Sequence, residues 1–266
     1  MKYVKYIMVT LIVFLFALTI FNDIGLGMIF NPDAMIIIFG GTILAVLIGF
    51  PLKRIQLAMA DVINAFRDKR DRDTVIGEVL EIARIYRRAD IRGLEKKMEH
   101  MGDDFLKIGV SLLINNHRSE RMRNIMDREM TNRIIQFHFS ENLLKTIARL
   151  TPSFGLVGTV ISLIKMFNSV HSFDMITPTM AVALMSTFYG VIISNLIMMP
   201  LSAKIKDHAI SYEALASVIT EGIIATNNTE HPLRIEEGLR GYHQRNDIST
   251  SGIETVSALH ESALKV

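Results

Sequence analysis

Two threonines and a serine stand in apolar segments where their hydroxyls could contact a cation. Thr159 lies in the run TPSFGLVGTVISLI, and Ser186 and Thr187 are neighbours in the run AVALMSTFYGVIISNLIMMP. A threonine oxygen suits a partly dehydrated hard cation, whereas a proton needs no such cage of oxygens. Small residues at four-residue spacing, such as Ser186, Gly190 and Ser194, also allow two helices simply to pack closely. Helix packing accounts for most of these residues, and Thr159 and Thr187 have the stronger case for a role in ion passage.

The same two runs each contain a proline, Pro152 and Pro200. Pro152 follows Thr151, so it is either the first residue of a helix capped by Thr151 or, if the preceding helix continues, the site of a kink. Pro200 stands inside an apolar run, where a proline removes a backbone hydrogen bond. We expect the two prolines to lie at matching depth in neighbouring helices and to form a hinge pair between the membrane helices and the cytoplasmic part.

Four apolar blocks are long enough to span a membrane. The mean hydropathy of the chain is +0.31 although 21% of its residues are charged, so the apolar residues must be concentrated in blocks. The third and fourth blocks are joined by a polar turn at residues 171–178 and contain no acidic residue, so the group that binds the ion must come from another chain. The four blocks comprise residues 6–21, 34–50, 152–170 and 180–201.

Lysine and arginine are distributed unevenly around these blocks. The loops at 22–33 and 171–178 have none, whereas residues 53–149 hold twenty of the 29. Because positively charged segments stay on the cytoplasmic side, both termini and the segment between the second and third blocks are predicted to be cytoplasmic, with some basic residues touching anionic lipid. Lys165 is the exception, and we interpret it as an anchor that reaches the outer interface; a role at the ion exit is the alternative.

The cytoplasmic segment has the periodicity of helices. Apolar residues at 75, 79, 82 and 85 recur at a spacing of three or four, with Thr74 as the expected cap, and a long helix is predicted to begin at Ser119. The fold class is therefore an all-α membrane protein with four transmembrane helices, a helical cytoplasmic domain between spans two and three, and a cytoplasmic C-terminal tail. The predicted divisions are 1–51 (spans one and two), 52–149 (cytoplasmic domain), 150–201 (spans three and four), 202–245 (C-terminal helices) and 246–266 (a flexible tail).

A cluster of charged residues lies in the cytoplasmic stretch YRRADIRGLEKKME. It can be an exposed surface for a charged partner, since charged rim contacts steer encounters more than they add affinity. Composition alone favours the other interpretation, an ordinary solvated helix end. Its members are Arg87, Arg88, Asp90, Arg92, Glu95, Lys96, Lys97 and Glu99.

Composition and motifs exclude several classes of protein. Residues 52–149 mix twenty basic with fifteen acidic side chains, and a nucleic-acid interface would be more one-sided. The absence of cysteine excludes disulfides and thiolate metal sites. No P-loop, GxGxxG motif or nucleophile elbow is present, so we expect neither an enzyme nor an ATP-driven pump, and no cofactor besides a transported Na⁺ or H⁺.

Three stretches resemble the MotA/PomA family of bacterial flagellar stator subunits. NPDAMIIIFGGTILAVLIGFPLKRI is similar to the family's second span, TPSFGLVGTVISLI to its third, and AVALMSTFYGVIISNLIMMPLSAKI to its fourth. HPLRIEEGLRGY resembles an element of the family's C-terminal part, so the resemblance covers roughly residues 25–245. It implies a multi-pass protein of the bacterial inner membrane that forms a pentameric ring around a dimer of a single-span MotB/PomB-type B subunit.

The resemblance also implies how the assembly works. The B subunit would supply the intramembrane aspartate, and ion flow would turn the ring so that its cytoplasmic domain pushes the rotor switch protein FliG. The family's two prolines correspond to Pro152 and Pro200. The charged pair of its rotor-facing helix corresponds to Arg87 and Glu95, with Arg88 as an additional charge in this chain.

Ion choice follows from the same resemblance. Sodium-type members have a threonine at the position of Thr159 and a pair of hydroxyls at the positions of Ser186 and Thr187, whereas proton-type members more often have alanine in place of Thr159. We therefore favour Na⁺ over H⁺ and take these three residues as the ion path.

Two other functions stay open. An ExbB/TolQ-type energiser shares the ion-driven ring, but it has three spans with the large cytoplasmic segment after the first, whereas two predicted spans precede that segment here. A non-transporting membrane scaffold, from a different class, would show no dependence on ions.

Overall fold

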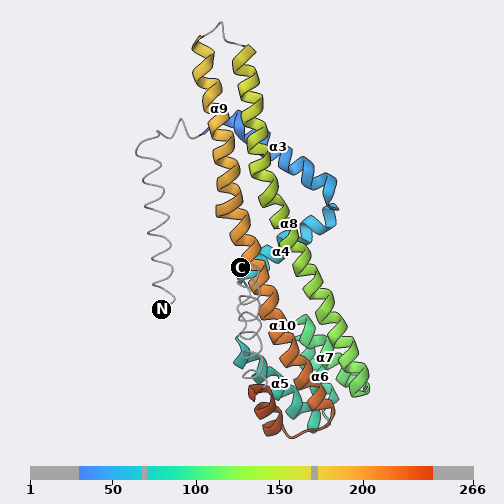
Figure 1. Ribbon diagram of the computed structural model, residues 1–266. Coiled ribbons are helices and arrows are strands. Elements are labelled where there is room, and N and C mark those ends of the chain that lie inside the picture. Colours follow the sequence, from blue (N-terminus) through green and yellow to red (C-terminus); the bar gives the residue numbers. More distant parts are fainter. Residues whose placement is uncertain (1–29, 68–70, 169–172, 242–266) are drawn as a thin grey trace, which may run out of the picture. The chain divides into compact units, whose positions relative to one another are not determined.

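The computed structural model describes residues 30–67, 71–168 and 173–241, and every element in these ranges is a helix (Figure 1). This confirms the prediction of an all-helical chain. The first predicted span, residues 6–21, and the predicted tail, residues 246–266, lie outside the described residues.

The chain forms two compact units, each assembled from segments far apart in sequence. We call the first, Met1–Ala60 with Ser140–Lys204, the membrane unit. The second, Asp61–Phe139 with Ile205–Val266, is called the charged unit. Three helices in the described ranges are long and apolar enough to cross a membrane, which makes the chain a multi-pass membrane protein.

Helix α3 (Pro32–Gly49) belongs to the membrane unit and corresponds to the predicted second span. Asn31 caps it, because its side chain accepts a hydrogen bond from the Ala34 N–H, and Pro32 occupies the first helical position. Ala34, Ile38, Thr42 and Val46 follow one another at four-residue spacing and are buried, so one stripe of α3 faces the neighbouring helices.

Residues 140–168 of helix α8 (Ser119–Asn168) form the hairpin of the membrane unit with helix α9 (Phe173–Ile192) (Figure 1). The turn between them is shorter than predicted, because α9 already begins at Phe173 and contains Pro178. Pro178 is the sixth residue of α9, where a proline leaves one backbone hydrogen bond of the helix unmade. After α9 the chain continues through η1 (Ile193–Met198), a π-helix, into α10 (Met199–Asn227).

Helix α8 begins at Ser119 as predicted and runs through Pro152 without interruption. The interpretation of Thr151 as an N-cap is therefore wrong, and the alternative of a proline within a continuous helix holds. The Thr151 Oγ1 atom lies 3.2 Å from the Ile147 carbonyl of its own helix, as expected for a threonine inside a helix rather than at its start.

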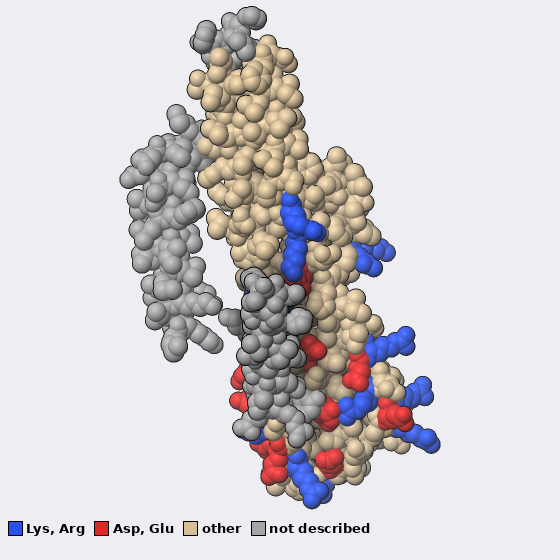
Figure 2. Space-filling model, viewed as in Figure 1, with Lys and Arg blue, Asp and Glu red and all other residues tan. Residues whose placement is uncertain are grey.

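The charged unit is built from α5 (Arg72–Arg87), α6 (Ile91–Glu99), α7 (Asp104–Ile114), the end of α4 (Leu52–Arg67), and parts of α8 and α10. Its core includes Val79 and Ile82 of α5, Leu106 of α7 and Ile223 of α10, each fully buried. The predicted apolar face of α5 is thus confirmed, but its cap is not Thr74, because the helix starts earlier and Asp71 occupies the N-cap position. Figure 2 shows acidic and basic side chains interspersed over the visible face of this unit.

The turn from α5 to α6 depends on Ala89, whose φ of 55° lies in the left-handed region that favours glycine. The Ala89 N–H donates to the Tyr86 carbonyl at 2.9 Å and the Asp90 N–H to the Ile85 carbonyl at 3.4 Å, which is the Schellman pattern of a helix end. The Asp90 side chain then accepts from the Gly93 N–H at 2.9 Å and caps α6. This turn sets the direction in which the charged residues on both helices project.

Candidate ion path and charged docking face

The structure brings Thr159 of α8 and Thr187 of α9 together. Their hydroxyl oxygens lie 2.7 Å apart, and either hydroxyl can donate to the other. The Thr159 Oγ1 atom also lies 3.1 Å from the Gly155 carbonyl and 3.1 Å from the Ala183 carbonyl. Four oxygen atoms therefore gather at one point between two apolar helices. We call the Thr159 and Thr187 hydroxyls the hydroxyl pair. Hard cations bind oxygen ligands of this kind.

Ser186 does not join the hydroxyl pair. It is fully buried, and its Oγ atom donates to the Val182 carbonyl of its own helix at 2.8 Å. Its side chain faces Gly158, where an added Cβ atom would lie 2.6 Å from the serine Oγ. Ser186 therefore packs α9 against α8, and the structure separates it from the two threonines with which the sequence grouped it.

Glycines of the same seam let the helix backbones come close. A Cβ atom on Gly155 would lie 2.8 Å from the Ser186 carbonyl oxygen, and one on Gly190 would lie 2.7 Å from the Thr151 carbonyl oxygen. Neither distance is possible for a real side chain without a shift of the backbone. This close packing brings the threonine hydroxyls within hydrogen-bond distance of each other.

The two prolines are not at matching depth, contrary to the prediction. Pro152 faces Gly190, and Pro200 comes ten residues further along the second helix, about 15 Å at the rise of an α-helix. At the level of Pro200, Ser202 lies near Glu141, with its Oγ atom 3.5 Å from the Glu141 carbonyl oxygen. The sequence could not show this offset, because it depends on the register in which the antiparallel helices pack.

Between the two prolines lies a contact that the sequence analysis missed. The Ser194 Oγ atom in η1 donates to the Ala148 carbonyl of α8 at 2.6 Å. The only signal in the sequence was the place of Ser194 in the small-residue repeat of this run, which predicted packing rather than a particular hydrogen bond.

Arg87, Arg88 and Glu95 are exposed, and none of their side chains has a hydrogen bond or ion pair to another described residue. They flank the α5–α6 turn, Arg87 ending α5 and Glu95 lying in α6. We call these three residues the docking face. Their free side chains can meet a charged partner without first breaking an internal ion pair.

Other members of the predicted charged cluster have structural partners. Asp90 is the cap of α6, and Lys97 forms an ion pair with Glu81 of α5, the two charged atoms being 2.8 Å apart. The structure therefore divides the cluster into residues that hold α5 and α6 together and residues that are available to a partner.

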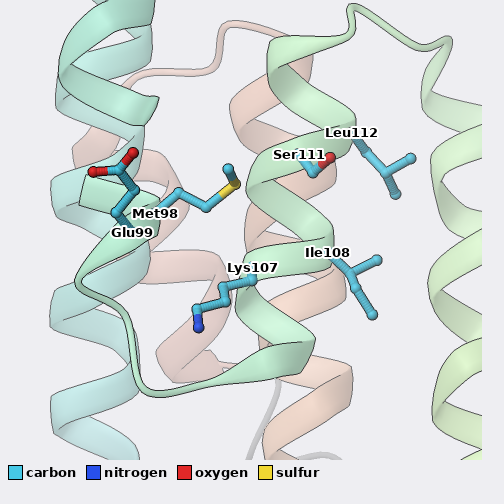
Figure 3. A pocket seen from close by; sticks show the side chains of 6 residues that line it. All are labelled: Met98, Glu99, Lys107, Ile108, Ser111 and Leu112. Carbon is cyan, nitrogen blue, oxygen red and sulfur yellow. The ribbon is translucent and has the colours of Figure 1, made fainter. Parts of the chain in front are cut away.

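A cavity of about 460 Å³ opens between the end of α6 and α7 (Figure 3). Met98, Ile108 and Leu112 supply most of its lining, with Glu99, Lys107 and Ser111 adding polar atoms.

The described residues contain no group of three or more histidine or acidic side chains that could hold a metal ion. Lys165 is exposed on α8. Figure 2 shows an uncharged surface over the upper part of the visible face, where α9 and the last part of α8 lie.

Comparison with known proteins defines the class. Residues 97–218 match the model of the MotA/TolQ/ExbB proton channel family, so this part of the chain is similar to the membrane ion channel subunits of that family. Within it, the chain is similar to MotA and PomA proteins. It is 26% identical to chemotaxis protein PomA of Vibrio alginolyticus, in a match that covers 82% of this chain and 86% of the relative. It is 27% identical to motility protein A of Bacillus subtilis, in a match that covers 84% of this chain and 83% of the relative.

A solved structure supports the same assignment. The chain matches the flagellar MotAB stator complex from Bacillus subtilis with a TM-score of 0.74 and 25% identity, over 90% of this chain and 96% of that chain. The agreement therefore extends well beyond the segment that matches the family model.

Proposed function

We propose that this chain is the A subunit of a bacterial flagellar stator, which uses ion flow across the membrane to turn the rotor. The observation that carries the proposal is the match to a MotAB stator over 90% of the chain. The hydroxyl pair between α8 and α9 and the exposed docking face on α5 and α6 are the two features that such a machine requires.

A B subunit with an intramembrane carboxylate completes the ion path. Residues 150–168 and 176–201 contain no aspartate or glutamate, yet the hydroxyl pair offers oxygen ligands without a compensating negative charge. A cation in a low-dielectric region needs a nearby anion. We infer a single-span MotB/PomB-type partner, surrounded by several copies of this chain, five by resemblance to the stator family.

The hydroxyl pair favours Na⁺ as the transported ion. The Thr159 and Thr187 hydroxyls and the Ala183 carbonyl could each give an oxygen to a cation at this level, in addition to the partner's carboxylate. A proton would need only the carboxylate. Ser186 is removed from this set, because its hydroxyl is engaged within its own helix and it has no exposed surface.

The docking face is the proposed contact with the rotor switch protein FliG. Arg87, Arg88 and Glu95 are exposed and unpaired among the described residues, so they can make and release charged contacts repeatedly. In this proposal both termini and the charged unit are cytoplasmic, and the membrane unit lies in the bacterial inner membrane.

The test is motility in a host that lacks its own stators and carries the cognate rotor protein. Swimming speed is measured for cells that express this chain with its B subunit, while Na⁺ is exchanged for K⁺ at fixed pH and membrane potential. Speed that rises with Na⁺ supports the sodium-driven stator, and speed independent of Na⁺ changes the ion to H⁺. Absence of motility despite normal membrane levels of both subunits would overturn the stator proposal in favour of an ExbB/TolQ-type energiser.

A further inference from the structure

Pro152 leaves one carbonyl group of α8 without its helical donor. A proline has no N–H, so the carbonyl four residues earlier, that of Ala148, loses the hydrogen bond that an α-helix would give it. Ala148 is 3% exposed, and a buried carbonyl without a donor is unfavourable, above all within a membrane. Some other group must therefore supply the hydrogen bond.

Ser194 supplies it from the opposite helix. Its Oγ atom lies 2.6 Å from the Ala148 carbonyl oxygen, and the serine is 6% exposed. Within the described part of the chain, the Thr151 hydroxyl also lies near this carbonyl, at 3.4 Å, but it is closer to the Ile147 carbonyl, at 3.2 Å. The short contact identifies Ser194 as the principal replacement for the missing N–H.

Ser194 also stands at an irregularity of its own helix. It lies in the π-helix Ile193–Met198, where the Met199 N–H donates to the Ser194 carbonyl five residues earlier. Pro200 follows Met199 directly. π-turns are wider than α-turns and often occur where a helix must adjust its register. One residue thus joins two irregularities, the backbone hydrogen bond that is missing at Pro152 of α8 and the π-helix that precedes Pro200. We call these two irregularities the helix breaks.

We propose that Ser194 is a positioning residue that couples the two helix breaks, so that α8 at Pro152 and the second helix at η1 bend together during the stator cycle. The inference deepens the proposed function and rests on it for the motility measurement. The contact between Gly190 and Pro152, one turn away, keeps the backbones close enough for the serine to reach its acceptor. Ion binding is assigned to other residues, so Ser194 acts on the movement and not on ion affinity.

The first test separates movement from ion binding. Swimming speed is measured against ion concentration for the complex with Ser194→Ala. We expect the maximal speed to fall roughly twofold or more, with no change in the ion concentration that gives half-maximal speed. Ser153→Ala is the matched control, because that hydroxyl donates within α8 to the Arg149 carbonyl at 3.0 Å and the side chain is exposed. Unchanged maximal speed, or a shift in the half-maximal ion concentration, would overturn the proposal.

The second test examines the hydrogen bond itself and does not require rotation. The melting temperature of the purified complex with its B subunit is measured for Ser194→Ala, Pro152→Ala and the double variant. Ser194→Ala alone should lower it by about 3 °C. The same change should have little effect in the Pro152→Ala background, because that substitution returns an N–H to the Ala148 carbonyl. An equal decrease in both backgrounds would show that the serine does not replace the missing donor.

The two tests distinguish the failure of this inference from the failure of the proposed function. If cells with the unmodified complex do not swim, the stator proposal fails, while the melting measurements still decide whether Ser194 serves the Ala148 carbonyl. If the unmodified complex supports motility and the serine behaves additively with Pro152, the stator proposal stands and the coupling role is wrong.

Discussion

Gly190 of α9 faces Pro152 of α8 so closely that a Cβ atom on Gly190 would lie 3.1 Å from the proline Cα atom. This contact fixes the register of the antiparallel pair. It places Pro200 ten residues beyond the level of Pro152 and brings Ser194 opposite Ala148. The two prolines therefore do not lie at the same depth in the helix pair. Each helix has its own helix break, and the hydrogen bond from Ser194 to the Ala148 carbonyl joins the two breaks.

We expect Gly190→Ala to disturb the helix pair. The added methyl group would meet the Thr151 carbonyl oxygen at 2.7 Å, so the backbones must separate, at a cost of about 1–3 kcal/mol. The measurement is the melting temperature of the purified complex. Gly77→Ala in α5 is the control, because a Cβ atom there meets nothing within 4 Å, and stability should rise by about 0.5–1 kcal/mol. Equal behaviour of the two variants would contradict the close approach at Gly190.

Pro152→Ala and Pro200→Ala should each leave membrane insertion and assembly largely intact but stop rotation. Each substitution restores a backbone donor, which regularises the helix and removes its preferred bending point. Assembly is measured by co-purification with the B subunit and rotation by tethered cells. Pro178→Ala near the start of α9 should preserve swimming. Normal swimming by either of the first two variants at normal expression would refute the role of the breaks.

Thr159→Ala should raise the Na⁺ concentration needed for half-maximal speed while membrane expression stays unchanged. The substitution removes one oxygen of the hydroxyl pair and leaves Thr187 with one contact fewer. Ser162→Ala, which removes a buried hydroxyl one turn further along α8, serves as the control. An unaltered response to Na⁺ would remove Thr159 from the ion path.

Arg87→Glu should weaken engagement with the rotor, because it reverses an exposed charge that ends α5. A compensating charge reversal on the rotor partner should restore motor recruitment, which is measured by counting fluorescent stators at the motor. Arg121→Glu, an equal charge change at an exposed position of α8, should have little effect. If torque and recruitment are unaltered in the first variant, the rotor contact lies elsewhere.

Alkaline pH should destabilise the charged unit through Tyr212. Burial, and next the negative charge of Asp103, raise the pKa of this tyrosine from 10.0 to about 12. A raised pKa in the folded state means that its contribution to stability is present below pH 10 and is lost as pH rises towards 12. The decrease in melting temperature over this interval should be smaller for Tyr212→Phe than for the unmodified chain. Identical decreases would show that the tyrosine does not contribute.

Much of the fold could be derived from local sequence. The apolar spacing of α5, the start of α8 at Ser119, and the spans in α3 and in the α8–α9 hairpin follow from hydrophobic periodicity and block length, which neighbouring residues determine. The errors also had local causes. Thr74 was taken for a cap because it precedes apolar residues, and Pro178 was taken for a turn because prolines usually mark turns, yet both lie inside helices.

The sequence by itself determined that this is an all-helical membrane protein with a segment that matches the MotA/TolQ/ExbB family, and it indicated which hydroxyls, prolines and charges to test, because residue type and spacing carry that information. Only the tertiary structure decided that Thr159 meets Thr187 while Ser186 turns back on its own helix, and that Ser194 completes the hydrogen bond that Pro152 leaves open. These relationships depend on the register and rotation of packed helices. The register of two packed helices is set by the positions at which glycines allow their backbones to approach. The sequence of one helix alone does not contain that information.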